Sequence, residues 1–313
     1  MDKSSKIYIA GCNGMVGNAI FRALQAENFQ NLIGTDRDDF DLTDQISTNR
    51  FFEQEKPEFV FLAAARVGGI GANDRFRAEF IYQNIMIQSN VIHAAWKNGV
   101  KKLLFLGSSC IYPKLAPQPL KEEHLLSGFL EPTNEPYAIA KISGIKMCQS
   151  YNAQYGTNFI SVMPTNLYGP NDNFDFENSH VLPAMLGKFH KAKIENEPIV
   201  TLWGSGKPMR EFLYVEDLAE ACVFLMQNYD DSKIINIGTG QDVTIAELAR
   251  IIQKTVGFEG EIIWDSSKPD GTPRKLLDVS RINNLGWKAK TSLEDGIKKS
   301  YNWFLQNQKG RLR

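Results

Sequence analysis

The first half of the chain alternates short, almost wholly apolar runs with longer segments in which apolar residues recur at helical spacing. The apolar runs predict strands at Ile7–Ala10, Asn31–Gly34, Phe59–Ala63, Leu103–Leu106 and Phe159–Met163. The longer segments predict helices near 15–27, 43–55, 76–98 and 135–155. Strands that alternate with helices favour a parallel sheet, and strands that are apolar throughout are typical of a sheet covered on both faces. The pattern therefore predicts an α/β protein with a doubly wound parallel sheet.

This rhythm changes after Met163, because Gly, Pro and Asn become frequent between Pro164 and Asn173. Further helices are expected at 180–192, 215–228 and 244–256, with short strands between them. Residues 265–274 are polar and rich in turn formers, and we expect them to form part of a ligand-binding loop. We predict a sheet domain of residues 1–164 plus approximately 212–240. Approximately 165–211 and 241–313 would form a smaller C-terminal α/β substrate lobe.

A glycine-rich turn follows the first predicted strand and opens the first predicted helix. Its sequence is Gly11-Cys12-Asn13-Gly14-Met15-Val16-Gly17, with glycines in a GxxGxxG pattern. Glycines allow the backbone to turn tightly and to approach a pyrophosphate, while the helix N-terminus supplies N–H groups and a favourable dipole. Because the turn lies between a strand and a helix, it predicts dinucleotide binding in a Rossmann-type sheet.

The residues after the second predicted strand bear on the choice between NADP and NAD. Asp36 is suited to the ribose 2′-hydroxyl of NAD, whereas Arg37 is suited to the 2′-phosphate of NADP. Asp41 and Leu42 follow closely and are expected to border the adenine. The sequence therefore leaves both cofactors open at this point.

Tyr137 and Lys141 are spaced by four residues, which places both side chains on one face of a predicted helix. A tyrosine pKa near 10 is high for acid–base work at neutral pH, and a nearby ammonium lowers it. A serine-rich turn, Gly107-Ser108-Ser109-Cys110, leaves the fourth predicted strand. A hydroxyl from Ser108 or Ser109 is placed to hold a carbonyl oxygen at the carboxyl edge of the sheet, where ligands bind in this architecture.

Composition narrows the classes of partner and location. The formal net charge is -1, so we expect neither nucleic acid nor an anionic membrane surface as a partner. No apolar run approaches the length of a membrane span, and the N-terminus lacks the features of a signal peptide. The four cysteines have no metal-ligand spacing, so we expect no metal site and reduced thiols in a cytoplasmic protein.

Five longer segments carry a resemblance to a known family: LGSSCIYPK (Leu106–Lys114), EPTNEPYAIAK (Glu131–Lys141), SVMPTNLYGP (Ser161–Pro170), WGSGKPMREF (Trp203–Phe212) and KPDGTPRKLLD (Lys268–Asp278). AAARVGG (Ala63–Gly69) fits as well. With these segments the chain resembles the extended short-chain dehydrogenase/reductase family, in particular its epimerase-reductases of GDP-4-keto-6-deoxy-D-mannose. The resemblance extends over nearly the whole chain.

The resemblance implies a role for each matching residue. Tyr137 matches the proton donor, Lys141 its partner, and Ser108 the serine that bonds the 4-keto oxygen. Cys110 and His180 match the pair that moves protons during epimerisation. Arg37 matches an arginine that favours NADP, whereas Asn13 departs from the basic residue often found there. Contacts with the GDP-sugar are implied for Lys188, Trp203, Arg210 and Asp270, and contacts with the cofactor for Ala63, Leu106, Gly107, Lys141, Pro164, Thr165, Asn166, Leu167 and His180.

The function implied is NADP(H)-dependent conversion of GDP-4-keto-6-deoxy-D-mannose to GDP-L-fucose by epimerisation at C3 and C5 and reduction at C4. A ketone acidifies the hydrogens on both neighbouring carbons, so Cys110 as base and His180 as acid suit epimerisation. Such a base must spend time as the thiolate, so an electropositive surrounding is expected. A homodimer is expected through the helices near 76–98 and 135–155. The alternatives are a reductase or epimerase-reductase of a related GDP-4-ketosugar such as a GDP-heptose, and a non-catalytic dinucleotide-binding redox sensor.

Overall fold

The computed structural model describes residues 1–35, 40–175, 179–268 and 270–307 of the chain. Asp36 and Arg37, which were assigned to the choice between NADP and NAD, lie outside these residues. Within the described ranges, no helix combines the length and the apolar character needed to cross a membrane.

The strands of the first half lie in one parallel sheet, and a strand from the second half completes it. The order across the sheet is β2-β1-β3-β4-β5-β9 within the described residues. Both neighbours of β1 lie parallel to it, with Ile7 paired to Leu32 on one side and to Phe59 on the other. The apolar runs form buried strands, which confirms the predicted fold class. The bounds are β1 Ile7–Ala10, β2 Leu32–Thr35, β3 Phe59–Leu62, β4 Lys102–Leu106, β5 Phe159–Pro164 and β9 Ile235–Ile237.

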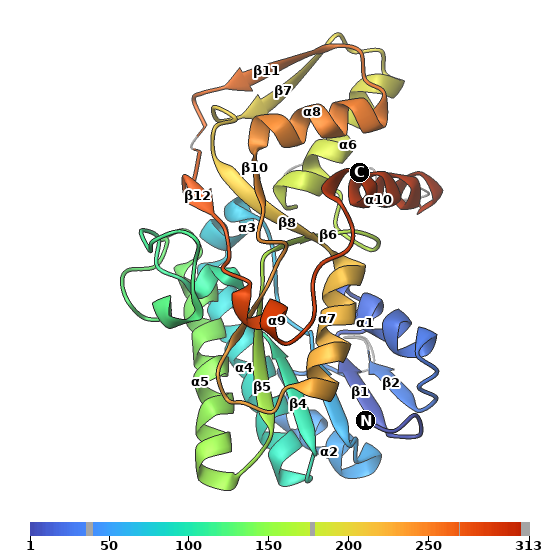
Figure 1. Cartoon of the computed structure of the whole chain (residues 1–313), viewed down its shortest axis with the longest axis vertical. Helices are drawn as coiled ribbons and strands as arrows, with labels where there is room; N and C mark the ends of the chain where they lie inside the picture. Colours follow the sequence, from blue (N-terminus) through green and yellow to red (C-terminus); the bar gives the residue numbers. More distant parts are fainter. Residues whose placement is uncertain (36–39, 176–178, 269, 308–313) are drawn as a thin grey trace.

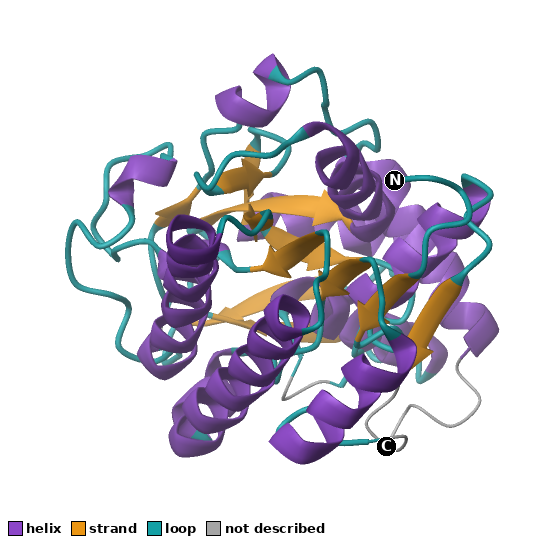
Figure 2. Cartoon of the chain, turned by 90° about the horizontal axis from the view of Figure 1, so that it is seen from below, coloured by secondary structure: helices purple, strands orange, loops and turns teal. Residues whose placement is uncertain are grey.

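Helices cover both faces of this sheet, as Figures 1 and 2 show. One pair of helices, α1 and α7, packs together, and a second group consists of α2, α4 and α5. Their bounds are α1 Met15–Ala26, α2 Gln45–Glu55, α3 Ile70–Arg75, α4 Arg77–Lys97, α5 Glu135–Tyr155 and α7 Val215–Asn228, with short 3₁₀ turns η1 Ser109–Ile111 and η2 Glu122–His124. The helices expected in this half are confirmed to within about two residues at each end.

The second half adds smaller sheets and their own helices at the upper end of the molecule in Figure 1. In one sheet β8 pairs with β6, β10 and β12, and in the other β7 pairs with β11. The strands are β6 Asn166–Tyr168, β7 Ile199–Trp203, β8 Met209–Tyr214, β10 Asp242–Thr244, β11 Glu261–Asp265 and β12 Arg274–Lys275. The helices are α6 Val181–Ile194, α8 Ile245–Val256, α9 Ser280–Asn284 and α10 Leu293–Asn307, of which α9 and α10 were not expected from the sequence.

Local sequence signals explain where α8 begins and ends. Thr244 accepts a hydrogen bond from the Glu247 backbone N–H (3.0 Å), and the Glu247 carboxylate in turn accepts one from the Thr244 N–H (2.8 Å). This reciprocal pair satisfies backbone donors that a helix start leaves open. Gly257 ends the helix with φ +71°, a left-handed conformation that glycine adopts without steric strain. Leu248, Ile252 and Val256 are therefore held on one buried face.

Two separate groups of buried apolar residues form the core. The larger surrounds the parallel sheet, and the smaller lies among α6, α8, α10 and the strands β7 and β8. Leu277, Ile282 and Trp287 belong to the larger group, although the sequence-based division places them with the second lobe. The chain thus returns to the parallel sheet after β12, which brings the segment after Lys275 close to the edge of that sheet.

Asp172, in the loop between β6 and α6, is a buried carboxyl with one unsatisfied oxygen. It is 6% exposed, Oδ1 accepts the Asn173 N–H at 2.8 Å, and Oδ2 has no hydrogen-bond partner among the described residues. Burial raises the pKa of Asp172 from 3.8 to about 7. The folded state therefore holds this proton more tightly than the unfolded chain does, so stability is lost as pH rises through about 7.

We expect Asp172→Asn to stabilise the protein at pH 8 and to have no such effect near pH 4. The pKa difference between 3.8 and about 7 corresponds to at most roughly 4 kcal/mol, which is at most about 7 °C in melting temperature. Thermal unfolding at pH 4, 6 and 8 measures the effect. Asp231→Asn, which changes an exposed carboxyl, serves as the control. An equal shift of melting temperature at every pH would show that ionisation of Asp172 is not the cause.

Candidate active site

The glycine-rich turn after β1 is built so that backbone can pack against backbone. Gly11 has φ +82°, and a Cβ there would lie 2.8 Å from the Ala64 Cα. A Cβ on Gly17 would lie 2.1 Å from the Gly11 carbonyl oxygen, so only glycine fits this crossing of helix and turn. Gly14 is exposed and forms the N-cap of α1. The glycine-rich segment therefore leaves the N-terminal end of helix α1 open toward the carboxyl edge of the sheet.

This turn fits a dinucleotide. In the part of the chain that the structure describes, no side chain caps the start of α1 and no acidic residue lies in its first turn. Uncapped N–H groups at a helix start, with the dipole behind them, are the arrangement that binds a pyrophosphate. The other expected cofactor contacts lie at the ends of neighbouring strands: Ala63 after β3, Leu106 and Gly107 at β4, and Pro164–Leu167 from the end of β5 into β6.

Leu42, expected to border the adenine, is buried in the larger core group instead of standing free at the surface. Its carbonyl accepts a hydrogen bond from Asn90 Nδ2 (2.9 Å). Asp41 lies beside it, and one of its carboxylate oxygens accepts the Thr43 N–H (2.9 Å). Leu42 and Asp41 therefore also stabilise the segment that leads into α2.

Ser108, Cys110 and Tyr137 are brought together where β4 ends. Ser108 Oγ accepts the Cys110 N–H at 3.2 Å, which caps the short turn η1. Both residues act on the pKa of Tyr137, which Ser108 lowers and the charge of Cys110 raises. A hydroxyl, a thiol and a phenol thus converge on one place at the carboxyl edge of the sheet.

Lys141 is buried beneath Tyr137 and does not act as the sequence suggested. Its Nζ donates a 2.8 Å hydrogen bond to the Leu106 carbonyl oxygen and lies 5.8 Å from the centre of the Tyr137 ring. Burial raises the pKa of Tyr137 and lowers the pKa of Lys141 to about 7. The spacing predicts that the ammonium lowers the tyrosine pKa, whereas desolvation of Tyr137 raises it. The phenol therefore stays protonated, which suits a proton donor.

His180 stands at the N-cap of α6, as the sequence predicted. The surrounding protein and the positive charge of Lys275 both lower its pKa, although solvent still reaches much of the residue. Lys275 in β12 also donates a hydrogen bond to Cys110 Sγ at 3.3 Å. One ammonium thus acts on both members of the expected acid–base pair.

The four residues expected to contact the GDP-sugar come from the second lobe. Trp203 is 58% exposed, and the ammonium groups of Lys188 and Lys268 each lie 5.5 Å from its ring centre. The Asp270 carboxylate accepts hydrogen bonds from the Ser205 N–H (2.6 Å) and hydroxyl (2.7 Å). Arg210 lies in β8, where the charges of Asp270 and Cys110 act on it. Arg210 therefore connects the aromatic and basic surface around Trp203 with the Cys110 region.

Two residues near this site were not singled out from the sequence. Lys275 lies inside the quoted segment Lys268–Asp278, and Glu211 inside Trp203–Phe212, but no function was assigned to either. Glu211 is fully buried, and its carboxylate accepts the backbone N–H groups of Thr239 (2.6 Å), Gly240 (2.7 Å) and Leu277 (2.9 Å). The signal that could have found it is an acidic residue directly before the apolar residues Phe212, Leu213 and Tyr214 of a strand.

Comparison with known proteins agrees with this arrangement. The model of the NAD dependent epimerase/dehydratase family matches residues 7–238. GDP-L-fucose synthase 1 of Arabidopsis thaliana is 58% identical over 98% of this chain and 95% of its own. Among solved structures, a GDP-6-OMe-4-keto-L-xylo-heptose reductase from C. jejuni is 44% identical with a TM-score of 0.92, covering 98% of this chain and 99% of its own. A GDP-L-fucose synthetase from Naegleria fowleri bound to NADP is 29% identical with a TM-score of 0.93, covering 100% and 98%. The chain therefore belongs to the NAD dependent epimerase/dehydratase family, in the group that contains the GDP-L-fucose synthases.

Proposed function

We propose that this protein is an NADPH-dependent enzyme that converts GDP-4-keto-6-deoxy-D-mannose to GDP-L-fucose, by epimerisation at C3 and C5 followed by reduction of the ketone at C4. The observation that supports it best is the convergence of Ser108, Cys110 and Tyr137 at the carboxyl edge of the sheet, with Lys275 linking Cys110 to His180. The similarity to a named GDP-L-fucose synthase at 58% identity supports the substrate. It also favours an enzyme over the non-catalytic redox sensor.

The proposed epimerisation uses a base and an acid on opposite faces of the sugar. Cys110 as thiolate removes the proton from C3 or C5, and His180 supplies a proton to the other face. The negative charge that develops on the ketone oxygen is stabilised by hydrogen bonds from Ser108 and Tyr137. The C4 ketone oxygen carries the developing negative charge in both epimerisations, because C3 and C5 are each adjacent to C4.

The proposed reduction ends with a proton transfer from Tyr137 to the C4 oxygen. NADP(H) would be held by residues 11–17 and by the strand-end residues named above, and when bound it supplies the hydride for C4. A bound NADP in the solved Naegleria fowleri relative supports this cofactor, and we propose a preference for NADPH over NADH. Burial keeps Tyr137 protonated, and Lys141 lies beneath it with its pKa lowered to about 7.

The test is the reaction of GDP-4-keto-6-deoxy-D-mannose in deuterated water, run side by side with NADPH and with NADH. We expect GDP-L-fucose with deuterium at both C3 and C5, and faster turnover with NADPH. NMR of the product determines which carbons carry deuterium. Product without deuterium at either carbon would contradict the epimerase half of the proposal.

A second candidate is the same chemistry on a related GDP-4-ketosugar. The C. jejuni heptose reductase, 44% identical over nearly the whole of both chains, is the observation that favours it. A panel that includes a GDP-4-ketoheptose separates the two, because the better substrate has the higher kcat/KM.

Three further features are proposals of the same kind. The two-part division stays a proposal as residues 1–164 plus approximately 212–240, with approximately 165–211 and 241–313 as the substrate lobe, although Leu277, Ile282 and Trp287 of the second part pack on the parallel sheet. A homodimer through α4 and α5 is supported by Tyr82 (62% exposed) and Ile139 (42%) on these two packed helices. A cytoplasmic location is supported by Cys110, Cys148 and Cys222, none of which is part of a disulfide.

A further inference from the structure

Lys275 reaches the proposed base from a strand far away in sequence. It is the second residue of β12 and is paired with Arg210 of β8, which lies parallel. Its Nζ is 3.3 Å from Cys110 Sγ, although the two residues are 165 positions apart. The ammonium is thus within hydrogen-bonding distance of the sulfur.

The backbone after Lys275 is held against the loop that follows Cys110. The Leu276 N–H donates to Gln118 Oε1 (2.9 Å), and the Leu276 carbonyl accepts the Leu120 N–H (2.7 Å). One residue later, the Leu277 N–H donates to the buried Glu211 carboxylate (2.9 Å). These bonds fix the start of the Lys275 side chain relative to the loop that carries Cys110.

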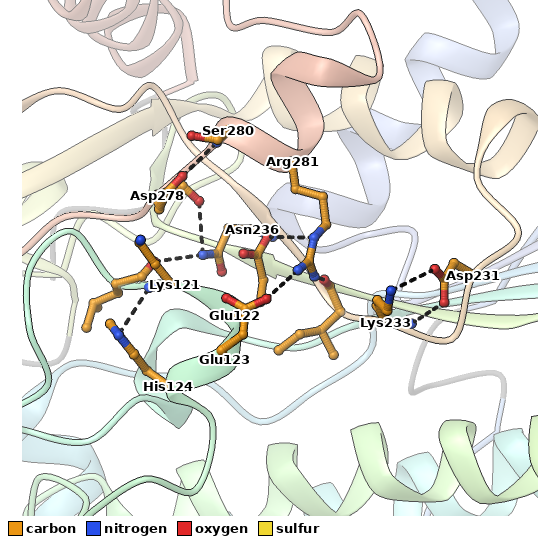
Figure 3. Close-up of polar contacts among 12 residues, drawn as sticks. Lys121, Glu122, Glu123, His124, Asp231, Lys233, Asn236, Asp278, Ser280 and Arg281 are labelled. Carbon is orange, nitrogen blue, oxygen red and sulfur yellow. Dashed lines mark hydrogen bonds and ion pairs between the residues drawn. The ribbon is translucent and has the colours of Figure 1, made fainter.

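A second layer of hydrogen bonds, drawn in Figure 3, continues this attachment beyond Leu277. The fully buried Asn236 of β9 donates from Nδ2 to the carbonyl oxygens of Leu120 (2.9 Å) and Asp278 (3.1 Å). Its Oδ1 accepts a 2.5 Å hydrogen bond from the Tyr112 hydroxyl, two residues after Cys110. Tyr112 therefore ties the Cys110 turn to the same side chain that holds the segment after Lys275.

The titratable groups that act on Cys110 come from β12, β8 and α5. Lys275 lies in β12 and Arg210 in β8, and both are cations. Tyr137 of α5 faces the sulfur as a neutral phenol, because burial raises its pKa. His180 is linked to the group through Lys275. The surroundings of Cys110 are thus electropositive, which was expected of a cysteine that acts as a base.

We propose that Lys275 is a catalytic residue of the epimerisation, whose ammonium holds Cys110 as the thiolate that removes the proton beside the ketone. The inference deepens the proposed function and rests on it, since it assigns a partner to the proposed base. The proton leaves carbon for sulfur, giving a thiol and an enolate, and His180 protonates the opposite face. Each group then exchanges its proton with solvent, and Lys275 keeps its own protons throughout. The same ammonium repels a proton on His180, which makes the imidazolium the stronger acid.

The test measures the thiolate directly, without substrate. Wild-type protein and the variants Lys275→Met, Lys275→Arg and Lys298→Met are alkylated with iodoacetamide between pH 5 and 10, and Cys110 is quantified by peptide mass spectrometry. In the wild type we expect the midpoint of the Cys110 profile below the ~8.5 of an ordinary thiol. Lys275→Met moves it upward by about one pH unit, so alkylation at pH 7 slows about tenfold. Lys275→Arg keeps most of the effect, and the exposed Lys298→Met changes nothing.

Two results would overturn the inference. One is a wild-type midpoint at or above that of an ordinary thiol, a measurement that does not depend on how any variant folds. The other is an unchanged Cys110 profile in Lys275→Met together with a higher KM for the GDP-sugar, which would make Lys275 a substrate-binding residue only. Labelling of the buried Cys148 reports unfolding of a variant. Because the alkylation assay contains no substrate, its result is independent of whether GDP-L-fucose is the product.

Discussion

Replacement of Tyr137 by Phe is expected to lower the rate of ketone reduction by about 10²–10⁴-fold while hydrogen exchange at C3 and C5 continues. The phenol is the proposed proton donor to the C4 oxygen, and burial keeps it protonated at neutral pH. The variant retains Cys110 and Ser108. Hydrogen exchange at C3 and C5 is therefore slowed only because the Tyr137 phenol no longer helps to stabilise the enolate. NADPH consumption measures reduction, and NMR in deuterated water measures exchange.

A matched control for this variant lies on the same helix. Tyr151 also belongs to α5, but its hydroxyl hydrogen-bonds His93 Nδ1 (2.8 Å) away from the carboxyl edge of the sheet. Tyr151→Phe should therefore leave NADPH consumption close to that of the wild type. Equal loss of reduction and exchange in Tyr137→Phe, with the fold intact, would argue that the phenol positions the substrate and is not the specific donor for the reduction.

Replacement of Cys110 by Ser is expected to have the opposite effect. Deuterium incorporation at C3 and C5 should fall by about 10²–10⁴-fold, because a serine hydroxyl gives up its proton far less readily than a thiol does. Reduction of the unepimerised ketosugar should continue at a much higher relative rate, since Tyr137 and Lys141 are unchanged. The sugar formed would then retain the configuration of the substrate at C3 and C5.

The control for Cys110 is a buried cysteine that takes no part in the proposed chemistry. Cys148 of α5 is fully buried, and burial raises the pKa of its thiol. Cys148→Ser is expected to keep both exchange and reduction. Full deuterium incorporation by Cys110→Ser would mean that another group removes the proton, and the assignment of Cys110 as the base would then fail.

Much of this site could be predicted from local sequence. The turn Gly11–Gly17, the pair Tyr137 and Lys141, and Ser108 each lie at a strand end or on one helix face, where spacing alone decides which side chains meet. The glycines at 11 and 17 are required by close backbone contacts that the strand–turn–helix pattern already indicates. The resemblance supplied functions for Cys110, His180 and the residues around Trp203, whose assignments remain predictions.

The electrostatics of the site could not be read in the same way. The sequence suggested that Lys141 lowers the pKa of Tyr137. In the structure, burial raises the pKa of Tyr137, and the Lys141 ammonium donates a hydrogen bond to the Leu106 carbonyl oxygen. Desolvation depends on what packs around a group, and spacing along one helix does not contain that information. The same holds for Asp172, whose raised pKa results from its burial.

The sequence by itself determined the parallel sheet, the strand-end turns and the helix face that carries Tyr137 and Lys141, because each depends on periodicity and on neighbours within a few residues. Only the tertiary structure decided that Lys275 meets Cys110 and that Glu211 and Asn236 hold the strand that carries it. Those contacts join residues more than 40 positions apart, and they exist because the chain returns to the edge of the parallel sheet after β12. Contacts of this kind depend on the packing of whole layers, which no local pattern specifies.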